Sequence, residues 1–395
     1  MPERWPLATF GSLYAQPSRN GVSYPTRLRG AGVPMVNMRE LFAFDRIRNQ
    51  DMELVPLTEK ERGERLLEEG DLLFARQSLV REGAGRVVYV EAGPPRTWEG
   101  HVIRVRLDRA RADPRYFYYF FRSPLGRSSI EAIVEQVAAA GIRGSDLSTM
   151  RVPVPSLPEQ RATAEVLGAL DDKIEANRRE QEAAESLARA ELARAQEHAE
   201  TAVRIGTLVG RVSDIIKAEE LTEDDVYVGL EHMPRGSLLL KEHGTTQGVA
   251  SAKAIFQPND VLFGKLRPYF KKVVIAPSAG VCSTDILVLR PKEGDWALAA
   301  AVCASDEVID YATAGSEGTR MPRVSWDYLS RYEVRLPASA GRRKLQERMA
   351  PLLDFGMQLT AESRILANLR DTLLPKLLSG ELRVRDAESL VETTP

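Results

Sequence analysis

The chain has 395 residues, with 54 lysines and arginines against 56 aspartates and glutamates, a net charge of −2 and a hydrophobic share of 43%. This composition excludes a disordered or fibrous chain, and the length predicts two or three domains. No apolar run approaches the roughly 20 residues of a membrane-spanning helix, the first residues lack a signal-peptide pattern, and only two cysteines occur. We therefore expect a cytoplasmic protein without a disulfide framework.

The motifs of several enzyme classes are absent from the sequence. Gly264-Lys265 is the one Gly-Lys pair, and Asn259 stands where the first glycine of a phosphate-binding loop would be. Neither a glycine-rich dinucleotide fingerprint nor the Asn-Pro-Pro-aromatic motif of an amino-methyltransferase occurs, and the four histidines are too scattered for metal-ligand spacing. We expect no catalytic residue and no metal in this chain, and a function that lies in a binding surface.

Residues 1–155 predict a mixed α/β domain. Residues 86–89 and 101–107 have strand-like apolar patterns between Gly- and Pro-rich turns, and residues 114–122 suit a short helix. The aromatic run in that helix, residues 116–121, has two interpretations. It is either a platform on which bases stack or, as we favour, a helix face that is buried against the sheet.

Residues 156–203 predict a long helix, because they contain no glycine beyond Gly168, no proline after Pro158 and many Ala, Glu, Arg and Leu residues. A 4-3 alternation typical of a coiled-coil seam runs along this segment. Its positions are Leu167, Leu170, Ile174, Asn177, Gln181, Ala184 and Ala188. In such a seam, Asn177 is expected to fix the register of pairing at some cost in stability.

From residue 204 onward the sequence repeats what precedes it. Four short matches recur in the same order at a spacing of about 180 residues. They are 71–76 with 260–265, 141–143 with 318–320, 147–155 with 329–337, and 170–171 with 353–354. Their order predicts a tandem duplication, and two unrelated domains of similar composition are the alternative. The second α/β domain, residues 204–337, is expected to have strands and a helix at 272–275, 286–289 and 296–304.

Residues 338–385 predict a second long helix. The same 4-3 alternation passes through Leu345, Met349, Leu352, Gly356, Leu359, Ser363, Leu366, Leu369 and Leu373. Pro351 and Pro375 are expected to kink this helix or to mark its ends. Two helices of about 40–48 residues are long enough to pair antiparallel as a rod of roughly 60–70 Å. Two solvated linkers are the alternative, which the leucine stripe disfavours.

Basic and amide side chains gather in loops at equivalent places of the two repeats. Lysine and arginine neutralise phosphates, and arginine or glutamine pairs with base edges. An ordinary solvated surface is the alternative for each loop taken alone. The DNA-binding candidates are Arg76, Gln77, Ser78, Arg81, Arg86 and Arg143 in the first repeat, and Lys265, Arg267, Tyr269, Lys271, Lys272, Arg320 and Arg323 in the second.

Three stretches resemble the specificity subunits of type I restriction-modification systems. Residues 157–161, Leu-Pro-Glu-Gln-Arg, followed by residues 167–174, are similar to the central spacer helix of that family. Residues 369–382 look like the end of its second spacer helix, and residues 263–270 are similar to a stretch of its target recognition domains. The start of the second helix, residues 340–343, departs from the Leu-Pro-Glu-Gln-Arg pattern.

The resemblance implies a mixed α+β fold with approximate two-fold symmetry. Two similar target recognition domains, 1–155 and 204–337, would be joined by spacer helices over 156–203 and 338–385, with a tail at 386–395. The helices would pair as an antiparallel coiled coil through the two seams described above.

The implied function is that of a non-catalytic DNA-specificity subunit. It would read a split double-stranded target and recruit two modification (methyltransferase) subunits and restriction (translocase) subunits. S-adenosylmethionine, ATP and Mg are expected on those partners, and no cofactor is expected in this chain. If the rod sets the unread spacer between half-sites, about four residues inserted after Ala188 are expected to change that spacer.

Two functions of other classes compete with this expectation. One is a coiled-coil scaffold that binds protein rather than DNA, and the other is a divergent nuclease with an unrecognised site. Sequence-specific adenine methylation by the chain mixed with a methyltransferase partner distinguishes the three functions. The modest net charge further predicts that the isolated chain binds DNA weakly, with partners contributing phosphate contacts.

Overall fold

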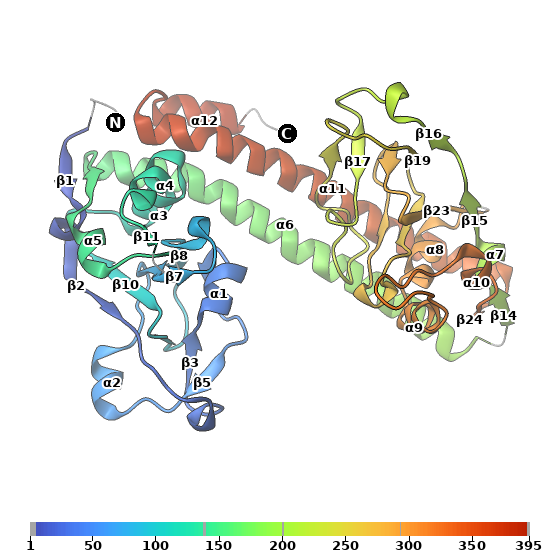
Figure 1. Cartoon of the computed structure of the whole chain (residues 1–395), viewed down its shortest axis with the longest axis horizontal. Helices are drawn as coiled ribbons and strands as arrows, with labels where there is room; N and C mark the ends of the chain where they lie inside the picture. Colours follow the sequence, from blue (N-terminus) through green and yellow to red (C-terminus); the bar gives the residue numbers. More distant parts are fainter. Residues whose placement is uncertain (1–4, 137–139, 200, 293, 393–395) are drawn as a thin grey trace. The chain divides into compact units, whose positions relative to one another are not determined.

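The computed structural model describes residues 5–136, 140–199, 201–292 and 294–392 (Figure 1). Its contacts divide the chain into two units: unit 1 consists of Met1–Asp172 with Ala367–Pro395, and unit 2 consists of Lys173–Leu366. Each unit contains one globular block and a stretch of each of two long helices. We call the globular parts block 1 (residues 5–155) and block 2 (residues 201–337).

Block 1 is built on a five-stranded sheet in the order β2-β10-β6-β8-β4, with smaller sheets β1-β13, β5-β3-β9 and β11-β12-β7. Its strands are β1 Leu7–Thr9, β2 Tyr14–Asn20, β3 Val33–Val36, β4 Arg46–Ile47, β5 Glu53–Val55, β6 Leu72–Ala75, β7 Gln77–Ser78, β8 Val87–Val90, β9 Thr97–Trp98, β10 Val102–Leu107, β11 Glu135–Gln136, β12 Ala140–Gly141 and β13 Arg151–Pro153. Its helices are η1 Phe10–Leu13, η2 Thr26–Leu28, α1 Met38–Ala43, α2 Glu59–Glu64, η3 Arg81–Gly83, α3 Pro114–Arg122, α4 Pro124–Glu131 and α5 Gly144–Thr149.

Block 2 contains sheets in the orders β15-β23-β20-β21, β16-β19-β22-β17-β18 and β14-β24. Its strands are β14 Thr201–Arg204, β15 Val209–Val212, β16 Ile215–Ile216, β17 Val226–Val228, β18 Gly244–Thr245, β19 Lys253–Phe256, β20 Val261–Gly264, β21 Val273–Ile275, β22 Gly280–Cys282, β23 Ile286–Pro291 and β24 Glu333–Leu336. Its helices are α7 Ile205–Leu208, η4 Ala218–Glu220, η5 Pro268–Phe270, α8 Trp296–Cys303, α9 Asp306–Ala314 and α10 Trp326–Leu329.

The two blocks share the same detail at the start of their central strands. Asp71, just before β6, is buried and accepts hydrogen bonds from Nε and Nη2 of Arg106 in β10, at 2.7 and 2.8 Å. Asp260, just before β20, is buried likewise and accepts two from Arg290 in β23, at 2.9 and 2.7 Å. The strand orders β10-β6-β8 and β23-β20-β21 also correspond. These matches confirm the predicted duplication.

The aromatic helix α3 belongs to the core of block 1. All six side chains of residues 116–121 are at most 1% exposed. The ring of Phe121 lies 4.8 Å from that of Phe10 and 5.1 Å from that of Phe74, measured between centroids. The interpretation as a buried helix face is therefore confirmed, because no ring of this run is accessible to a base.

Two long helices, α6 Leu157–Glu197 and α11 Ser339–Ser379, follow the two blocks, and a short helix, α12 Val384–Glu392, comes last. The seam positions of α6 are buried, except for the half-buried Ile174. In α11 the seam positions are buried or half-buried throughout, with Leu345, Met349, Leu359, Leu366 and Leu373 at 8% exposure or less. One face of each helix is thus removed from water, which stabilises the fold. In unit 2, Ala188, Leu345 and Met349 belong to the same buried cluster as the core of block 2.

Several predicted boundaries of the long helices were wrong. The first helix ends at Glu197 rather than at residue 203, because residues 201–204 form β14 and pair with β24. The second ends at Ser379, where Gly380 takes the left-handed conformation (φ 73°) that commonly terminates helices. Part of the predicted tail is helical, since α12 begins at Val384.

Neither proline of α11 marks an end of the helix. Pro351 and Pro375 both lie inside Ser339–Ser379, which excludes the second of the two predicted alternatives, that they mark its ends. Both side chains are exposed to solvent. A carbonyl that loses its helical partner on a solvent-facing side can bond to water, so the cost of an interior proline is lower there.

The two long helices run antiparallel within unit 2. Asn177 donates a hydrogen bond to Glu362 at 2.9 Å, and Glu191, further along α6, pairs with Arg348, earlier in α11, at 3.1 Å. Residues later in α6 therefore contact residues earlier in α11. Asn177 is fully buried, so its polar contact favours this one register over slipped alternatives.

In unit 1 an ion cluster joins block 1 to both long helices. Asp171 of α6 accepts hydrogen bonds from Tyr119 of α3 (2.7 Å), Arg46 of β4 (3.1 Å) and Arg370 of α11 (2.7 Å). Asp172, the next residue, pairs with Arg46 as well. The side chains of Arg46 and Asp171 are only 8% and 11% exposed. We call these five residues the Asp171 cluster.

The Asp171 cluster predicts a loss of stability in acid. Burial acts to raise the pKa of Asp171, but the nearby charges of Arg370 and Arg46 and the hydrogen bonds from Arg370 and Tyr119 outweigh it and lower the pKa below its usual 3.8. A carboxyl with a lowered pKa in the folded state binds fewer protons than in the unfolded chain. Its stabilisation is therefore present above pH about 4 and is lost as the pH falls further. Thermal unfolding followed from pH 7 to pH 3 should show this decline, and a transition temperature constant down to pH 3 would contradict it.

Candidate nucleic-acid interface

In block 1 the structure brings the two predicted loops together. Strand β7 pairs antiparallel with β12, so that Gln77 lies opposite Gly141 and Ser78 opposite Ala140. The amide of Ile142 also donates to the carbonyl of Arg76 at 2.9 Å. We call residues 76–86 together with residues 140–143 loop pair 1.

Block 2 has the same arrangement. The amide of Arg267 donates to the carbonyl of Pro322 at 2.8 Å, and the amide of Val324 donates to the carbonyl of Lys265 at 3.1 Å. The guanidinium of Arg267 also donates to the carbonyl of Arg320 at 3.1 Å. We call residues 265–272 together with residues 317–323 loop pair 2. Each block therefore joins its two basic loops by backbone hydrogen bonds.

Some candidate side chains have no partner among the described residues. Gln77, Arg81 and Arg320 are exposed, and Arg76 and Lys265 are half-buried. Among the residues that the structure describes, the side chains of these five form no ion pair or hydrogen bond. Such side chains are free to contact phosphates or base edges without breaking an internal interaction.

Other candidates form exposed ion pairs. Arg143 pairs with Glu135 at 2.6 Å, with both side chains more than half exposed, and Lys271 pairs with Asp306 at 2.7 Å. Exposed pairs of this kind contribute roughly 0–1 kcal/mol. A phosphate can therefore replace the carboxylate at little cost.

Three candidates have internal partners that hold the loops. Arg323 donates from Nε and Nη2 to Asp285, at 2.8 and 3.1 Å, and these hydrogen bonds lower the pKa of Asp285. Lys272 donates to the carbonyl of Leu230, and burial lowers its pKa. Arg86 donates to the carbonyl of Leu41 at 2.8 Å. These cations position the loop pairs.

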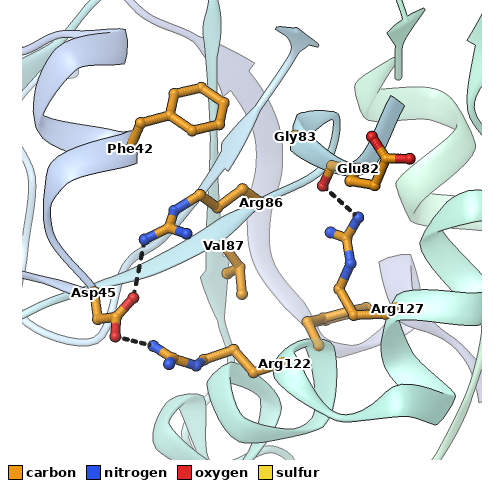
Figure 2. A pocket seen from close by; sticks show the side chains of 9 residues that line it. Phe42, Asp45, Glu82, Gly83, Arg86, Val87, Arg122 and Arg127 are labelled. Atoms are coloured by element: carbon orange, nitrogen blue, oxygen red, sulfur yellow. Dashed lines mark hydrogen bonds and ion pairs between the residues drawn. The ribbon is translucent and has the colours of Figure 1, made fainter. Parts of the chain in front are cut away.

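Arg86 lies in a pocket behind loop pair 1 (Figure 2). The pocket is lined by Phe42, Asp45, Glu82, Gly83, Arg86, Val87, Phe121, Arg122 and Arg127. Asp45 is held between Arg86 at 3.0 Å and Arg122 at 2.8 Å, and Arg127 donates to the backbone carbonyl of Glu82 at 2.9 Å. The arginines of this pocket thus anchor the base of the loop to α1, α3 and α4.

Loop pair 2 contains two strained backbone positions. Arg267 and Lys271 flank η5 and both have φ of 53°, in the left-handed region. This conformation costs a residue other than glycine roughly 1–2 kcal/mol. Strain of this kind is retained where the surrounding structure fixes it and is common at functional sites. No sequence signal indicates it, because neither position is glycine or asparagine.

Two glutamines that were not among the candidates connect the long helices to the blocks. Gln160, fully buried in α6, accepts the amide of Asp113 at the start of α3 at 2.8 Å. Gln346 in α11 accepts the amide of Leu298, near the start of α8, at 3.0 Å. The second helix therefore keeps this contact although its first turn lacks the Leu-Pro-Glu-Gln-Arg pattern. The family motif contains Gln160 and was the available signal.

The predicted helix-pairing residues lie on the buried faces of α6 and α11 described above. Among the described residues, no group of three His, Cys, Asp or Glu side chains is arranged to hold a metal ion. In the same part of the chain, no helix combines the length and apolarity that a bilayer span requires.

Comparisons with known proteins agree on one family. A family model, the type I restriction modification DNA specificity domain, matches residues 31–186. The chain is 20% identical over 396 residues to the MjaIX specificity subunit of Methanocaldococcus jannaschii, covering 90% of this chain and 88% of that protein. It is 28% identical over 146 residues to the EcoDI specificity subunit of Escherichia coli, covering 34% of this chain and 31% of that protein.

The fold is similar to that of a solved structure over nearly the whole chain. The crystal structure of the type I restriction-modification S subunit from M. genitalium is similar with a TM-score of 0.61 at 15% identity, covering 95% of this chain and 96% of that one. The fold similarity includes block 2 and α11, which the family model does not reach. Residues 31–186 thus match the DNA specificity domain of type I restriction-modification systems, and the chain is similar to a specificity subunit of such a system over most of its length.

Proposed function

We propose that this chain reads a split DNA target, with each loop pair contacting one half-site in the major groove. The observation that carries the proposal is the repeated joining of two basic loops by backbone hydrogen bonds, once in each block. Gln77 and Arg81 in loop pair 1, and Lys265 and Arg320 in loop pair 2, leave donors free for base edges and phosphates. Two separate loop pairs suit a target in which two specified half-sites flank a spacer of unspecified sequence.

The paired helices α6 and α11 would set the distance between the two readers. A helix rises 1.5 Å per residue and resists bending far more than a loop does, so a helix pair is suited to act as a ruler. The buried register contact of Asn177 with Glu362 supports a single, fixed pairing. The domain limits of 1–155 and 204–337, with helices between and after them, follow from the same proposal.

Catalysis would come from partner subunits. Two modification subunits would bring S-adenosylmethionine and flip the target adenines out of the duplex, and restriction subunits would bring ATP and Mg. This chain would hold no cofactor. Its net charge is −2, so on binding it would release few of the counterions that surround DNA, and this release is a major source of affinity. Phosphate contacts by the methyltransferase subunits would therefore supply much of the affinity.

Mapping methylated adenines tests the proposal. The chain is expressed with its methyltransferase partner in a host that lacks adenine methylation, and the methylated sequence motif is determined. We expect a motif of two specified parts with an unspecified spacer. In a Gln77→Ala, Arg81→Ala variant, we expect one part to relax and the other to stay unchanged. A continuous motif, or methylation without sequence preference, would overturn the proposal.

The scaffold and nuclease alternatives have no comparable support. The relatives that match this chain are named as specificity subunits, and no contact in the described residues favours either alternative.

A further inference from the structure

Loop pair 1 ends in two exposed apolar side chains. Leu79 is 100% exposed and Val80 is 60% exposed. They lie between β7, which carries Gln77, and η3, which begins at Arg81. Single exposed apolar residues are common on proteins, but here two consecutive ones occupy the tip of a loop whose neighbours are cations and amides.

Loop pair 2 has apolar side chains at the corresponding place. The repeat aligns Lys265 with Arg76, which brings Tyr269 to the position of Val80. Tyr269 is 48% exposed, and Met321, in the other loop of the pair, is also 48% exposed. Four of the large apolar side chains that the described residues leave exposed therefore fall on the two loop pairs.

The backbone of loop pair 1 is held by hydrogen bonds, whereas the side chains at its tip are exposed. The amide of Gly85 donates to the carbonyl of Ala75 at 2.9 Å, the amide of Val80 donates to Oγ of Ser78 at 3.2 Å, and Arg127 holds the carbonyl of Glu82 (Figure 2). An anchored loop presents its tip at little further entropic cost. The apolar surface of Leu79 is therefore available to a bound molecule.

The charges around the tip indicate what that molecule is. Arg76 and Arg81 flank Leu79, and their side chains form no hydrogen bond or ion pair with the residues that the structure describes. They therefore suit a polyanion, and the amide of Gln77 suits a base edge. The apolar feature that duplex DNA offers in its major groove is the C5 methyl group of thymine. A protein surface would leave the two cations without phosphates.

From this arrangement we infer that Leu79, with Val80, contacts a thymine methyl group in the first half-site and is a specificity-determining residue. Tyr269 and Met321 have the equivalent role in the second half-site. The inference rests on the proposed function and adds a base preference to it: the half-site read by block 1 contains a thymine whose methyl group is recognised.

A single methyl group can be removed from the DNA to test this. Each thymine of the mapped first half-site is replaced in turn by deoxyuridine, and binding by the complex with its methyltransferase subunits is measured. For the wild-type chain we expect one position at which affinity falls by about fourfold, the effect of one buried methyl group. For Leu79→Ala we expect a loss of less than about twofold at that same position.

Two variants control the experiment. Leu28→Ala removes another exposed leucine of block 1, 50% exposed in η2, and should keep the full sensitivity to deoxyuridine. Leu79→Met keeps an apolar tip and should restore most of it. A first half-site without thymine, a wild-type chain indifferent to every substitution, or equal sensitivity in Leu79→Ala would overturn the inference. In each of these cases a split methylation motif would leave the proposed function standing.

Discussion

Replacing both Lys265 and Arg267 by glutamate is expected to lower methylation of the target by about 100-fold or more. In the described part of the chain the side chain of Lys265 forms no hydrogen bond or ion pair, and Arg267 is fixed by hydrogen bonds to the carbonyls of Pro322 and Arg320. The double reversal would place two carboxylates against phosphates in the second half-site. The methylation rate of a duplex carrying the mapped motif measures the effect, and any residual methylation should have lost its preference in that half alone.

A matched reversal distinguishes a lost contact from a change in net charge. Arg211 and Lys217 are exposed cations of the same block, on β15 and just after β16. Their replacement by glutamate changes the charge equally and should leave the rate within about twofold. Wild-type methylation in the Lys265→Glu, Arg267→Glu chain would remove loop pair 2 from the interface.

Replacing Asp171 by alanine is expected to destabilise unit 1 by about 3 kcal/mol. The substitution removes the acceptor of three hydrogen bonds and leaves Arg46, at 8% exposure, without its most buried counter-charge. Breaking one partner of a buried pair costs more than the pair contributes, because the remaining charge stays desolvated. Urea unfolding followed by a probe in block 1 measures the change.

The duplication supplies the control for this variant. Asp354 holds the place of Asp171 in the second helix, yet it is exposed, and partial burial raises its pKa without an ion pair in the described residues. Asp354→Ala should therefore change the free energy of unfolding by no more than about 0.5 kcal/mol. If Asp171→Ala and Asp354→Ala lowered the free energy of unfolding equally, the Asp171 cluster would not stabilise unit 1 more than an exposed aspartate does.

The fold was predictable from the sequence because its signals are periodic and repeated. The 4-3 spacing from Leu167 to Ala188 reports directly which positions are buried, since a helix places every third and fourth residue on one face. Asp71 and Asp260 occupy equivalent positions of the repeat and have the same structural role, because each carboxylate accepts a hydrogen bond from an arginine of a neighbouring strand. The limits of the long helices were less predictable, since the start of β14 depends on its pairing with a strand more than 120 residues later.

The candidate site was predictable only at the level of loops. A sequence shows that Arg81 and Arg86 are basic. It does not show that Arg86 is held by Asp45 and the carbonyl of Leu41, whereas the side chain of Arg81 has no partner in the described ranges. Partners so far apart in the chain are brought together by the sheet. The same holds for Arg46, whose contact with Asp171 spans more than 120 residues.

The length of the paired helices is best changed where the helices make no contact with the blocks that an insertion would break. An insertion after Ala188 would cut through contacts with block 2, because Glu185 accepts the amide of Leu238 at 2.9 Å and Arg189 donates to the carbonyl of Gly236 at 3.2 Å. The limits of the two units, between Asp172 and Lys173 in α6 and between Leu366 and Ala367 in α11, are better places. About four residues added at both lengthen each helix by about 6 Å.

The spacer of the methylated motif in this lengthened chain tests the central claim most directly. About four residues added after Gly248, in an exposed turn of block 2, serve as the control and should leave the motif unchanged. For the lengthened helices, we predict the same two half-sites separated by a spacer that is about one or two base pairs longer. The original spacer, recovered with both half-sites intact, would contradict the claim that the helix pair holds two readers at a fixed distance.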